Sequence, residues 1–377
     1  MKLIYLANAR IPTPRAQGYA IMKMCEQFAR LGTSVELVVP NKKNYETEGD
    51  PFVYYRIERN FSIKRVGSID LLGPFEAFGR LFFWVDLLSF LFALRFTQKI
   101  EHDDILYTRD FLLALLFPRQ IVCLEVHQIP ASKFLFRRAI KIPKLFIVLN
   151  DNLKKILVEM GVEASRIHVF ASGVEITEFD IDISQENARK ISELPSGRDI
   201  VMYTGHLYAW KGADTLAEAA VSMPETCFVF VGGIEPELGK FKEKYKHCGN
   251  IILRPFVQRE KIPAYLKSAD VLVIPNSKHE KISAQYTSPL KLFEYMASKR
   301  PIVVSDLSSM RAVLNEKNAF FAEADESASF SKVIQNVLKN KERSTEIAEQ
   351  AFRDVQKYSW KKRAEDIWTL ILAAESK

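Results

Sequence analysis

Short apolar runs that recur along the whole chain constrain its fold more than any other feature. The runs are continuously apolar rather than alternating, which is typical of strands that helices bury on both faces. Helical patterns such as 21–32 and 214–223 lie between them. This alternation predicts βαβ units and therefore an α/β fold with parallel sheets. The runs are 2–8, 34–40, 104–109, 120–127, 145–150 and 167–172 in the first half, and 199–205, 227–233, 251–257, 271–276 and 301–305 in the second.

The alternating pattern weakens at 173–198, which is polar and acidic at first and contains Pro195 and Gly197. We therefore predict two doubly wound, Rossmann-like domains that face each other across a cleft. The N-terminal domain covers 1–172, the junction 173–198 and the C-terminal domain 199–358, and the helix expected at 359–375 can pack back on the first domain. Such sheets bind ligands beyond the carboxyl ends of their strands, so chemistry is expected directly after each run.

Composition limits the class of protein without naming a partner. The chain has 377 residues, of which 48% are hydrophobic, and a net charge of +7 that permits anionic partners but requires none. Its four cysteines are far apart and have no C-x-x-C spacing, which predicts reduced thiols in a cytoplasmic compartment. The first apolar run is too short for a signal peptide, and no apolar stretch approaches the roughly 20 residues that span a bilayer.

The segment YTSPLKLFE, 286–294, is a candidate anion site. Ser288 is predicted to cap a helix whose first residue is Pro289, so that the free amides and the helix dipole attract a phosphate. Lys291 adds a full charge. Glu294, six residues after Ser288, lies about 9 Å along the axis from that serine, where a carboxylate suits the hydroxyls of a ribose. Taken by itself, the segment fits an ordinary capped helix with a surface glutamate at least as well.

Two further candidates follow predicted strands. In the loop 204–216, which Gly205 opens, Lys211 can neutralise a diphosphate with His206 as a second donor, or it can be an ordinary solvated lysine. His127 follows the run 120–127 and can donate to a sugar hydroxyl, act as an acid or base, or serve only the structure.

Other signals argue against particular functions. Only Gly18 stands where a dinucleotide fold has G-x-G-x-x-G, which argues against NAD or FAD, although this glycine can still let the backbone approach a ligand. The acidic pair in 180–182 is predicted to be solvated, and no Cys/His cluster indicates a metal.

The run 81–94 is predicted to be a core helix, with membrane contact as the less favoured interpretation. The basic residues of 133–144 fit one face of a membrane-surface helix or a solvated helix equally well.

In this order along the chain, these segments resemble the family-4 retaining glycosyltransferases, which have the GT-B fold. SPLKLFEYMASKRPIVVSD, 288–306, resembles the nucleotide-binding helix of that family, and GHLYAWKG, 205–212, its phosphate-binding loop. FASGVEITEF, 170–179, is similar to the stretch at the domain crossover, with Ser172 and Glu175 as departures. Further matches are 229–233, 254–257 and 268–277, and the likeness is weaker in 1–165.

The resemblance implies a nucleotide-sugar donor bound mainly by the second domain and a glycan or lipid-linked acceptor bound by the first. Lys211 would hold the diphosphate, Glu294 the ribose, and His127 the donor sugar, and these three are the implied catalytic residues. No metal, cofactor or nucleic acid is implied. The implied donor-binding residues are Gly18, Gly205, His206, Pro255, Phe256, Val257, Tyr286, Thr287, Ser288, Pro289, Leu290 and Lys291.

Two departures from the family pattern affect this interpretation. His206 stands where the family usually has an arginine, and Tyr286 stands where the first glutamate of an E-x7-E pair is expected. The leading prediction is a retaining hexosyltransferase that uses a UDP- or GDP-sugar in cell-surface polysaccharide or glycolipid synthesis. It would be cytoplasmic, with an anionic membrane surface as a candidate partner. The alternatives are a non-catalytic nucleotide-sugar-binding protein and a GT-B-fold epimerase, although no convincing carboxylate cluster serves the latter.

Overall fold

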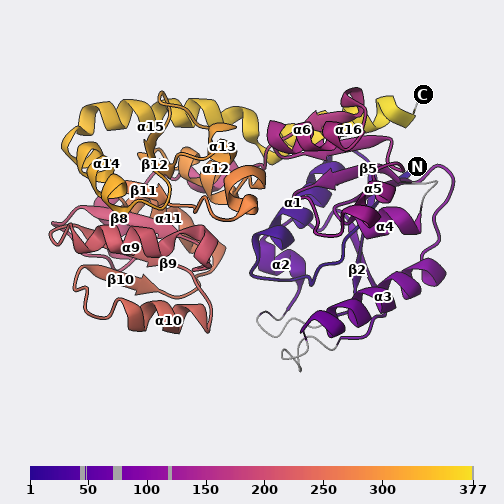
Figure 1. The fold of residues 1–377 in the computed structure, drawn as a ribbon, viewed down its shortest axis with the longest axis horizontal. Helices are drawn as coiled ribbons and strands as arrows, with labels where there is room; N and C mark the ends of the chain where they lie inside the picture. The colour runs from indigo at the N-terminus through magenta and orange to yellow at the C-terminus, as the bar shows by residue number, and fades with distance from the viewer. Residues whose placement is uncertain (43–46, 48, 71–78, 118–120, 376–377) are drawn as a thin grey trace. The chain divides into compact units, whose positions relative to one another are not determined.

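The chain folds into two compact units, which are described here one at a time (Figure 1). The computed structural model describes residues 1–42, 47, 49–70, 79–117 and 121–375. The first unit consists of 1–170 together with the C-terminal segment from 360 onward, and the second unit consists of 171–359.

The first unit is built on a parallel sheet with the strand order β3-β2-β1-β4-β5-β6-β7. In β1, Leu3 is in register with Val35 of β2 on one side and Ile105 of β4 on the other. Its helices connect the strands. The strands are β1 (Lys2–Leu6), β2 (Ser34–Pro40), β3 (Ser62–Val66), β4 (Ile105–Thr108), β5 (Ile121–Val126), β6 (Leu145–Val148) and β7 (Ile167–Val169). The helices are α1 (Ala16–Arg30), α2 (Pro51–Tyr55), α3 (Gly79–Thr97), α4 (Phe111–Leu116), α5 (Lys133–Ala139), α6 (Asp151–Glu159) and α16 (Trp360–Glu375).

Alternate side chains of this sheet pack into different helix layers, because strand residues point to opposite faces in turn. Ile4 and Leu106 share a core with Phe90 of α3 and Leu113 of α4. On the opposite face, Tyr107 contacts Phe28 of α1, which also packs against Trp368 of α16. The C-terminal helix α16 thus packs beside α1 in the first unit, although the whole second unit precedes it in sequence.

The second unit has a parallel sheet with the order β10-β9-β8-β11-β12-β13. Its two faces carry separate hydrophobic cores, and α12 and α15 lie against one while α9 and α14 lie against the other. The strands are β8 (Ile200–Thr204), β9 (Cys227–Val231), β10 (Ile251–Arg254), β11 (Val271–Ile274), β12 (Ile302–Ser305) and β13 (Phe320–Ala322). The helices are α7 (Ile176–Phe179), α8 (Gln185–Ile191), α9 (Ala213–Val221), α10 (Glu237–Lys244), α11 (Ile262–Ser268), α12 (Leu290–Ala297), α13 (Ser308–Arg311), α14 (Ser327–Lys339) and α15 (Lys341–Val355).

The predicted α/β class with two doubly wound parallel sheets is confirmed. Two strands were not predicted: β3 reads SIKRV, which is too polar for the pattern of a buried strand, and β13 has three residues. The segment 173–198 contains α7 and α8 and belongs to the second unit. Its apolar side chains Val174, Phe179 and Leu194 lie in that unit's core.

The basic helix expected over 133–144 is shorter than predicted. α5 ends at Ala139, with Ile140 as its C-cap, so Lys141 and Lys144 lie outside the helix. Pro143 cannot continue a helix, and the residue before it is also disfavoured in helical geometry. Across the described part of the chain, no helix combines the length and the apolarity needed to cross a membrane.

Candidate functional site

The candidate site of the second unit lies at the carboxyl edge of its sheet, beginning where β8 ends. Gly205 follows β8 with φ +130°, a backbone conformation that favours glycine, and its amide donates to the carbonyl of Val231 at 2.8 Å. A Cβ atom at this position would lie 3.2 Å from Nζ of Lys291. The glycine therefore brings the backbone close to a lysine amine that comes from another element.

Lys291, in the first turn of α12, carries a buried amine. Its side chain is 8% exposed, and no hydrogen-bond partner for Nζ exists among the described residues. The amine lies 3.7 Å from the centre of the Tyr203 ring. Burial, followed by the charge of Lys211, holds the pKa of Lys291 well below its usual range. Because a buried amine without an anion is costly, this arrangement favours an anionic ligand.

Lys211 lies close enough to Lys291 for their charges to interact. It ends the short 3-10 helix Ala209–Lys211, with Nζ 3.9 Å from the centre of the Trp210 ring. Burial lowers the pKa of Lys211 to about 8. Gly212 follows with φ +70°, and a Cβ there would overlap the carbonyl oxygen of Pro275, so the loop packs tightly on the residues after β11. The two amines together suit a ligand with more than one negative charge.

The start of α12 differs from the prediction. The N-cap is Pro289, in extended geometry and without a side-chain cap, and the helix begins at Leu290. Ser288 does not cap the helix, because its hydroxyl accepts the amide of Ser172 at 3.0 Å, and the Ser172 hydroxyl donates to the Ser288 carbonyl at 2.7 Å. The predicted cap was therefore wrong. Because no side chain caps α12, its first amides remain available to an anionic ligand.

Glu294, one turn after Lys291, is 7% exposed. Its Oε1 accepts from Nη1 of Arg259 at 2.8 Å, and Arg259 also pairs with Glu178 at 3.3 Å. Arg259 was not predicted from the sequence, because its partner lies 35 positions away and no local motif marks it. The carboxylate that was predicted to bind a ribose is thus oriented by an arginine.

Tyr295 fastens α12 to the end of β8. Its hydroxyl accepts the Thr204 amide at 2.8 Å and lies 3.0 Å from the Thr204 hydroxyl, and all of these groups are buried. Thr204 is the residue before Gly205, so this contact fixes the distance between the glycine loop and the helix that carries Lys291. This role could not be predicted from the sequence, because a buried tyrosine on a helix is usually part of the core.

Tyr286 closes a π-helix, Ile282–Tyr286, directly before the α12 segment. The Thr287 amide donates to the Ile282 carbonyl at 2.9 Å, which is the i to i+5 bond of a π turn. The tyrosine is 9% exposed and occupies the position where the resemblance expects a carboxylate. π turns are frequent at functional sites, and this one sets the entry of the chain into α12.

The remaining donor-binding candidates of the second unit lie on two loops. His206 stacks on Tyr208 with ring centres 5.1 Å apart, and its carbonyl accepts the Tyr203 hydroxyl at 2.6 Å. After β10, the residues predicted to contact a nucleotide base are accessible. Pro255 and Phe256 are exposed, and Val257 is half-buried against the core.

His127 and Gly18 belong to the first unit. His127 follows β5, and its Nε2 lies 2.7 Å from Oε1 of the buried Glu125. A Cβ at Gly18 would lie 2.2 Å from the hydroxyl of Tyr55 and 2.5 Å from Cγ2 of Thr13. Gly18 is therefore needed for the packing of the first unit, independently of any ligand.

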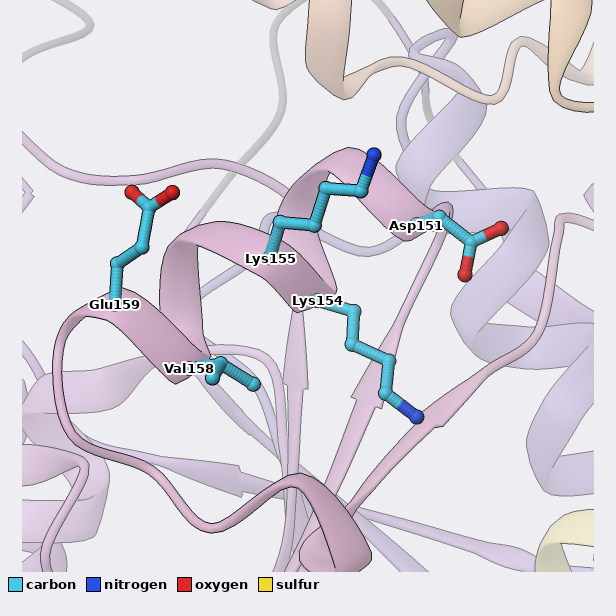
Figure 2. Close-up of a pocket in the computed structure, with 5 residues that line it drawn as sticks. All are labelled: Asp151, Lys154, Lys155, Val158 and Glu159. Atoms are coloured by element: carbon cyan, nitrogen blue, oxygen red, sulfur yellow. The ribbon is translucent and has the colours of Figure 1, made fainter.

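A hollow along α6 in the first unit is unrelated to these residues (Figure 2). It has a volume of about 570 Å³. All its lining residues come from one helix, and Figure 2 shows their side chains fanning out from it rather than converging. It therefore lacks the convergent groups of a binding site. The lining residues are Asp151, Lys154, Lys155, Val158 and Glu159.

The chemistry available in the second unit is recognition of an anion next to a diol. Two amines, a glycine loop and helix amides without a side-chain cap offer positive charge and donors, and Glu294 offers acceptors one turn further along the helix. Asp180, in the acidic pair of 180–182, is exposed and pairs with Lys299 at 2.7 Å. Nowhere in the described ranges do three or more His, Cys, Asp or Glu residues gather as metal ligands.

A family model described as glycosyl transferases group 1 matches residues 184–354, which include every candidate residue of the second unit. A D-inositol 3-phosphate glycosyltransferase of Xylanimonas cellulosilytica is 24% identical over 54% of this chain. A UDP-Gal:alpha-D-GlcNAc-diphosphoundecaprenol alpha-1,3-galactosyltransferase of Escherichia coli is 27% identical over 52% of it. The chain spans about half the length of these curated relatives, 50% and 52% respectively.

Solved structures match the fold over nearly the whole chain. A sucrose-phosphate synthase from Thermosynechococcus elongatus has a TM-score of 0.80 at 17% identity, with all of both chains covered. Anabaena Alr3699/HepE in complex with UDP and glucose has a TM-score of 0.74 at 15% identity, with 98% of this chain and 99% of that chain covered. The expected GT-B fold is therefore confirmed.

Proposed function

We propose that the chain, whose residues 184–354 match the family model of the glycosyl transferases group 1, is a retaining hexosyltransferase. It would move a sugar from a UDP- or GDP-sugar to a glycan or lipid-linked acceptor in the synthesis of a cell-surface polysaccharide or glycolipid. The curated relatives include an enzyme named for UDP-galactose and a diphosphoundecaprenol acceptor, and Alr3699/HepE binds UDP and glucose.

One observation carries the proposal: the two interacting amines of Lys211 and Lys291. Both have lowered pKa values, and Nζ of Lys291 is buried without a hydrogen-bond partner in the described part of the chain. A diphosphate would supply the missing negative charge. During transfer, the bond between the sugar and the diphosphate breaks and charge develops on the leaving group. Preorganised positive groups at that position lower the barrier, and no metal is needed for this role.

The other parts of the donor are assigned to further candidate residues. Glu294, oriented by Arg259, would accept hydrogen bonds from the ribose hydroxyls. The accessible loop at Pro255–Val257 would contact the base. His127 of the first unit would contact the donor sugar, as the resemblance implies.

Contact with an anionic membrane surface is the second part of the proposal, because the acceptor is expected to be lipid-linked. In α3, Trp84, Leu88, Phe92 and Phe96 are 45%, 58%, 69% and 72% exposed, and they recur every four residues along the helix. We call these four residues the α3 ridge. Leu87, Phe90 and Leu94, on the other side of α3, are buried in the core. An exposed row of large apolar side chains is unusual for a free surface.

Basic side chains lie within the same helix layer as the α3 ridge. α4 packs against both α3 and α5, and Lys133, Arg137 and Arg138 of α5 are exposed. Exposed lysines and arginines attract anionic lipid headgroups, while the apolar ridge would insert at the headgroup boundary.

The test is nucleotide release from a panel of UDP-, GDP- and ADP-sugars, compared between the wild-type protein and Glu294→Ala. Release from one donor that disappears in the variant supports the transferase and identifies its donor. If no nucleotide is released from any donor, with or without a panel of glycan and polyprenyl-diphosphate acceptors, the proposed activity is wrong.

A non-catalytic nucleotide-sugar-binding protein is the second candidate, and Tyr286 favours it. The tyrosine occupies the position of the first expected carboxylate, and His206 replaces an arginine that would stabilise an anion more strongly. Titration calorimetry together with the nucleotide-release assay separates the two candidates, because a binding protein has affinity for the donor but no turnover.

A further inference from the structure

We infer that Glu125 is a positioning residue, which holds His127 so that its inward ring nitrogen donates a proton and its outward nitrogen, Nδ1, can only accept. The group that His127 recognises must then be a hydrogen-bond donor, such as a sugar hydroxyl. This identification of the ligand rests on the proposed function, whereas the state of the ring follows from the first unit alone.

The first step of the argument is that Glu125 is ionised. Its side chain is fully buried at the end of β5. Oε1 accepts from Nη2 of Arg363 at 2.9 Å and from Nη2 of Arg109 at 3.2 Å, and the other oxygen accepts the Tyr107 hydroxyl. Burial alone would raise the pKa of Glu125, but the charges of Arg109 and Arg363 hold it well below its usual range. Two arginines face this single carboxylate, so their positive charges disfavour protonation of Glu125.

The second step concerns the nitrogen that faces the carboxylate. Nε2 of His127 lies 2.7 Å from Oε1 of Glu125. An ionised carboxylate has no proton to give, so a hydrogen bond at this distance requires the proton to be on the histidine nitrogen. This conclusion depends only on the charge of Glu125.

The third step concerns the other ring nitrogen. Burial, followed by the charge of Arg109, lowers the pKa of His127, so the ring carries a single proton at neutral pH. Because that proton is on Nε2, Nδ1 has a lone pair. The side chain is 36% exposed, and no hydrogen bond to Nδ1 is found in the described ranges. The ring therefore presents an acceptor to its surroundings and no donor.

The support for this arrangement comes from a distant part of the sequence. Arg363 belongs to α16 and lies 238 positions after Glu125, and its guanidinium also contacts Sδ of Met24 in α1. The return of the C-terminal helix to the first unit thus places a buried cation against the Glu125 carboxylate that His127 faces. A carboxylate that accepts one ring N–H of a functional histidine commonly fixes its tautomer in this way.

The decisive experiment is the tautomeric state of His127 in the full-length wild-type protein by ¹⁵N NMR of the histidine rings at pH 7.5. The chain has six histidines, and the spectrum of His127→Asn assigns the signal. We expect one neutral tautomer with the proton on Nε2. A proton on Nδ1, a doubly protonated ring or an equal mixture would overturn the inference, whether or not the protein transfers sugar.

Two variants test whether Glu125 is the cause. In Glu125→Gln, the amide can donate as well as accept, so we expect both tautomers of His127 to be populated. Tyr107→Phe removes another partner of Glu125 but keeps the carboxylate, and it should leave the tautomer unchanged. An unchanged tautomer in a folded Glu125→Gln variant would contradict the role of Glu125. If that variant does not fold, the wild-type spectrum alone decides.

A kinetic comparison then tests the ligand class once a donor is known. The amide oxygen of Asn can occupy the place of Nδ1, whereas that of Gln reaches further and resembles Nε2. We expect His127→Asn to keep at least tenfold more kcat/KM than His127→Gln. Equal losses in both variants would show that the acceptor at Nδ1 is not used. Absence of turnover in the wild-type protein would instead count against the proposed function and leave the tautomer result standing.

Discussion

Nη1 of Arg259 lies 2.8 Å from Oε1 of Glu294, and this ion pair joins the loop after β10 to the face of α12 that carries the candidate site. Glu294 is buried and Arg259 is half-buried, so the pair restricts the orientation of the carboxylate. An ionised carboxylate has further acceptor positions beyond the one that Arg259 occupies. Glu294 can therefore be oriented by the arginine and still receive hydroxyl groups from a ligand.

This relationship predicts that both residues contribute to donor binding. Glu294→Ala should weaken the binding of the nucleoside diphosphate by about 10- to 100-fold, since it removes hydrogen bonds to a charged acceptor. Arg259→Met should weaken it by about tenfold, because it leaves a buried carboxylate without its partner. Titration calorimetry with UDP and GDP measures both effects. Lys190→Met, which removes the cation of an exposed pair with Glu186 in the same unit, is the control and should bind normally. Normal affinity in Glu294→Ala would mean that the ribose site lies elsewhere.

The lowered pKa of Lys211, about 8, predicts a pH dependence of donor binding. The amine attracts a diphosphate only when it is protonated, so the contribution of Lys211 to affinity should be present below pH 8 and should be lost as the pH rises through 8. Around that pH, binding should also take up protons, which calorimetry detects as a dependence of the heat on the buffer. Lys211→Arg keeps its charge over this range and should lose most of the dependence between pH 7 and 9. An identical dependence in that variant would assign it to another group.

The course of the sheets could be predicted from the sequence because burial on both faces leaves a local signal. Runs such as 271–276 and 301–305 are apolar without interruption, and β11 and β12 lie within them. The strand β3 was missed because only one of its residues, Val66, is buried. The α3 helix was predicted as core, but its apolar residues are divided between a buried face and the exposed α3 ridge. An all-round apolar helix gives no sign in its sequence of which side is covered.

The candidate site was only partly predictable, because its contacts join distant positions. Lys211, Lys291 and Glu294 could be proposed from the sequence because each lies at a recognisable helix start or loop. The contacts that organise them, such as the one between Thr204 and Tyr295, 91 positions apart, leave no pattern in a single sequence. The same holds for Arg363 and Glu125. Ser288 was assigned to the wrong role because its local pattern is that of a cap, while its actual partner, Ser172, lies 116 positions earlier.

The buried contact of Tyr295 predicts a loss of stability as well as of binding. Tyr295→Phe leaves the buried Thr204 amide without its acceptor, which should lower the free energy of unfolding by about 1–3 kcal/mol. Urea denaturation measures this change. Tyr265→Phe is the matched control, because its hydroxyl makes no hydrogen bond within the part of the chain that the structure describes. If both variants lose the same free energy of unfolding, the hydrogen bond with Thr204 does not contribute measurably to stability.

Gly205 predicts a separate effect on the same loop. Gly205→Ala would need a left-handed conformation that alanine disfavours, and its methyl group would lie 3.2 Å from Nζ of Lys291. We expect a loss of about 1 kcal/mol in stability from the backbone and at least a tenfold loss in diphosphate affinity. Gly161→Ala, at a glycine that also has a positive φ (+94°) but has open space around it, is the control for the backbone alone. It should lose comparable stability and keep full affinity. If Gly205→Ala binds the diphosphate with normal affinity, binding does not depend on the close approach of Gly205 to the Lys291 amine.

The α3 ridge predicts that membrane binding depends on specific apolar side chains. Leu88→Glu, Phe92→Glu and Phe96→Glu should each reduce co-sedimentation with vesicles that contain an anionic phospholipid by about tenfold, because each removes an apolar side chain from the lipid boundary. Val53→Glu, at an exposed apolar residue of α2 in the same unit, should have no effect. Raising the salt concentration should weaken wild-type binding, since the basic residues of α5 contribute through screened charges. Wild-type binding in all three ridge variants, or no binding to anionic vesicles at low salt, would exclude the ridge as a membrane contact.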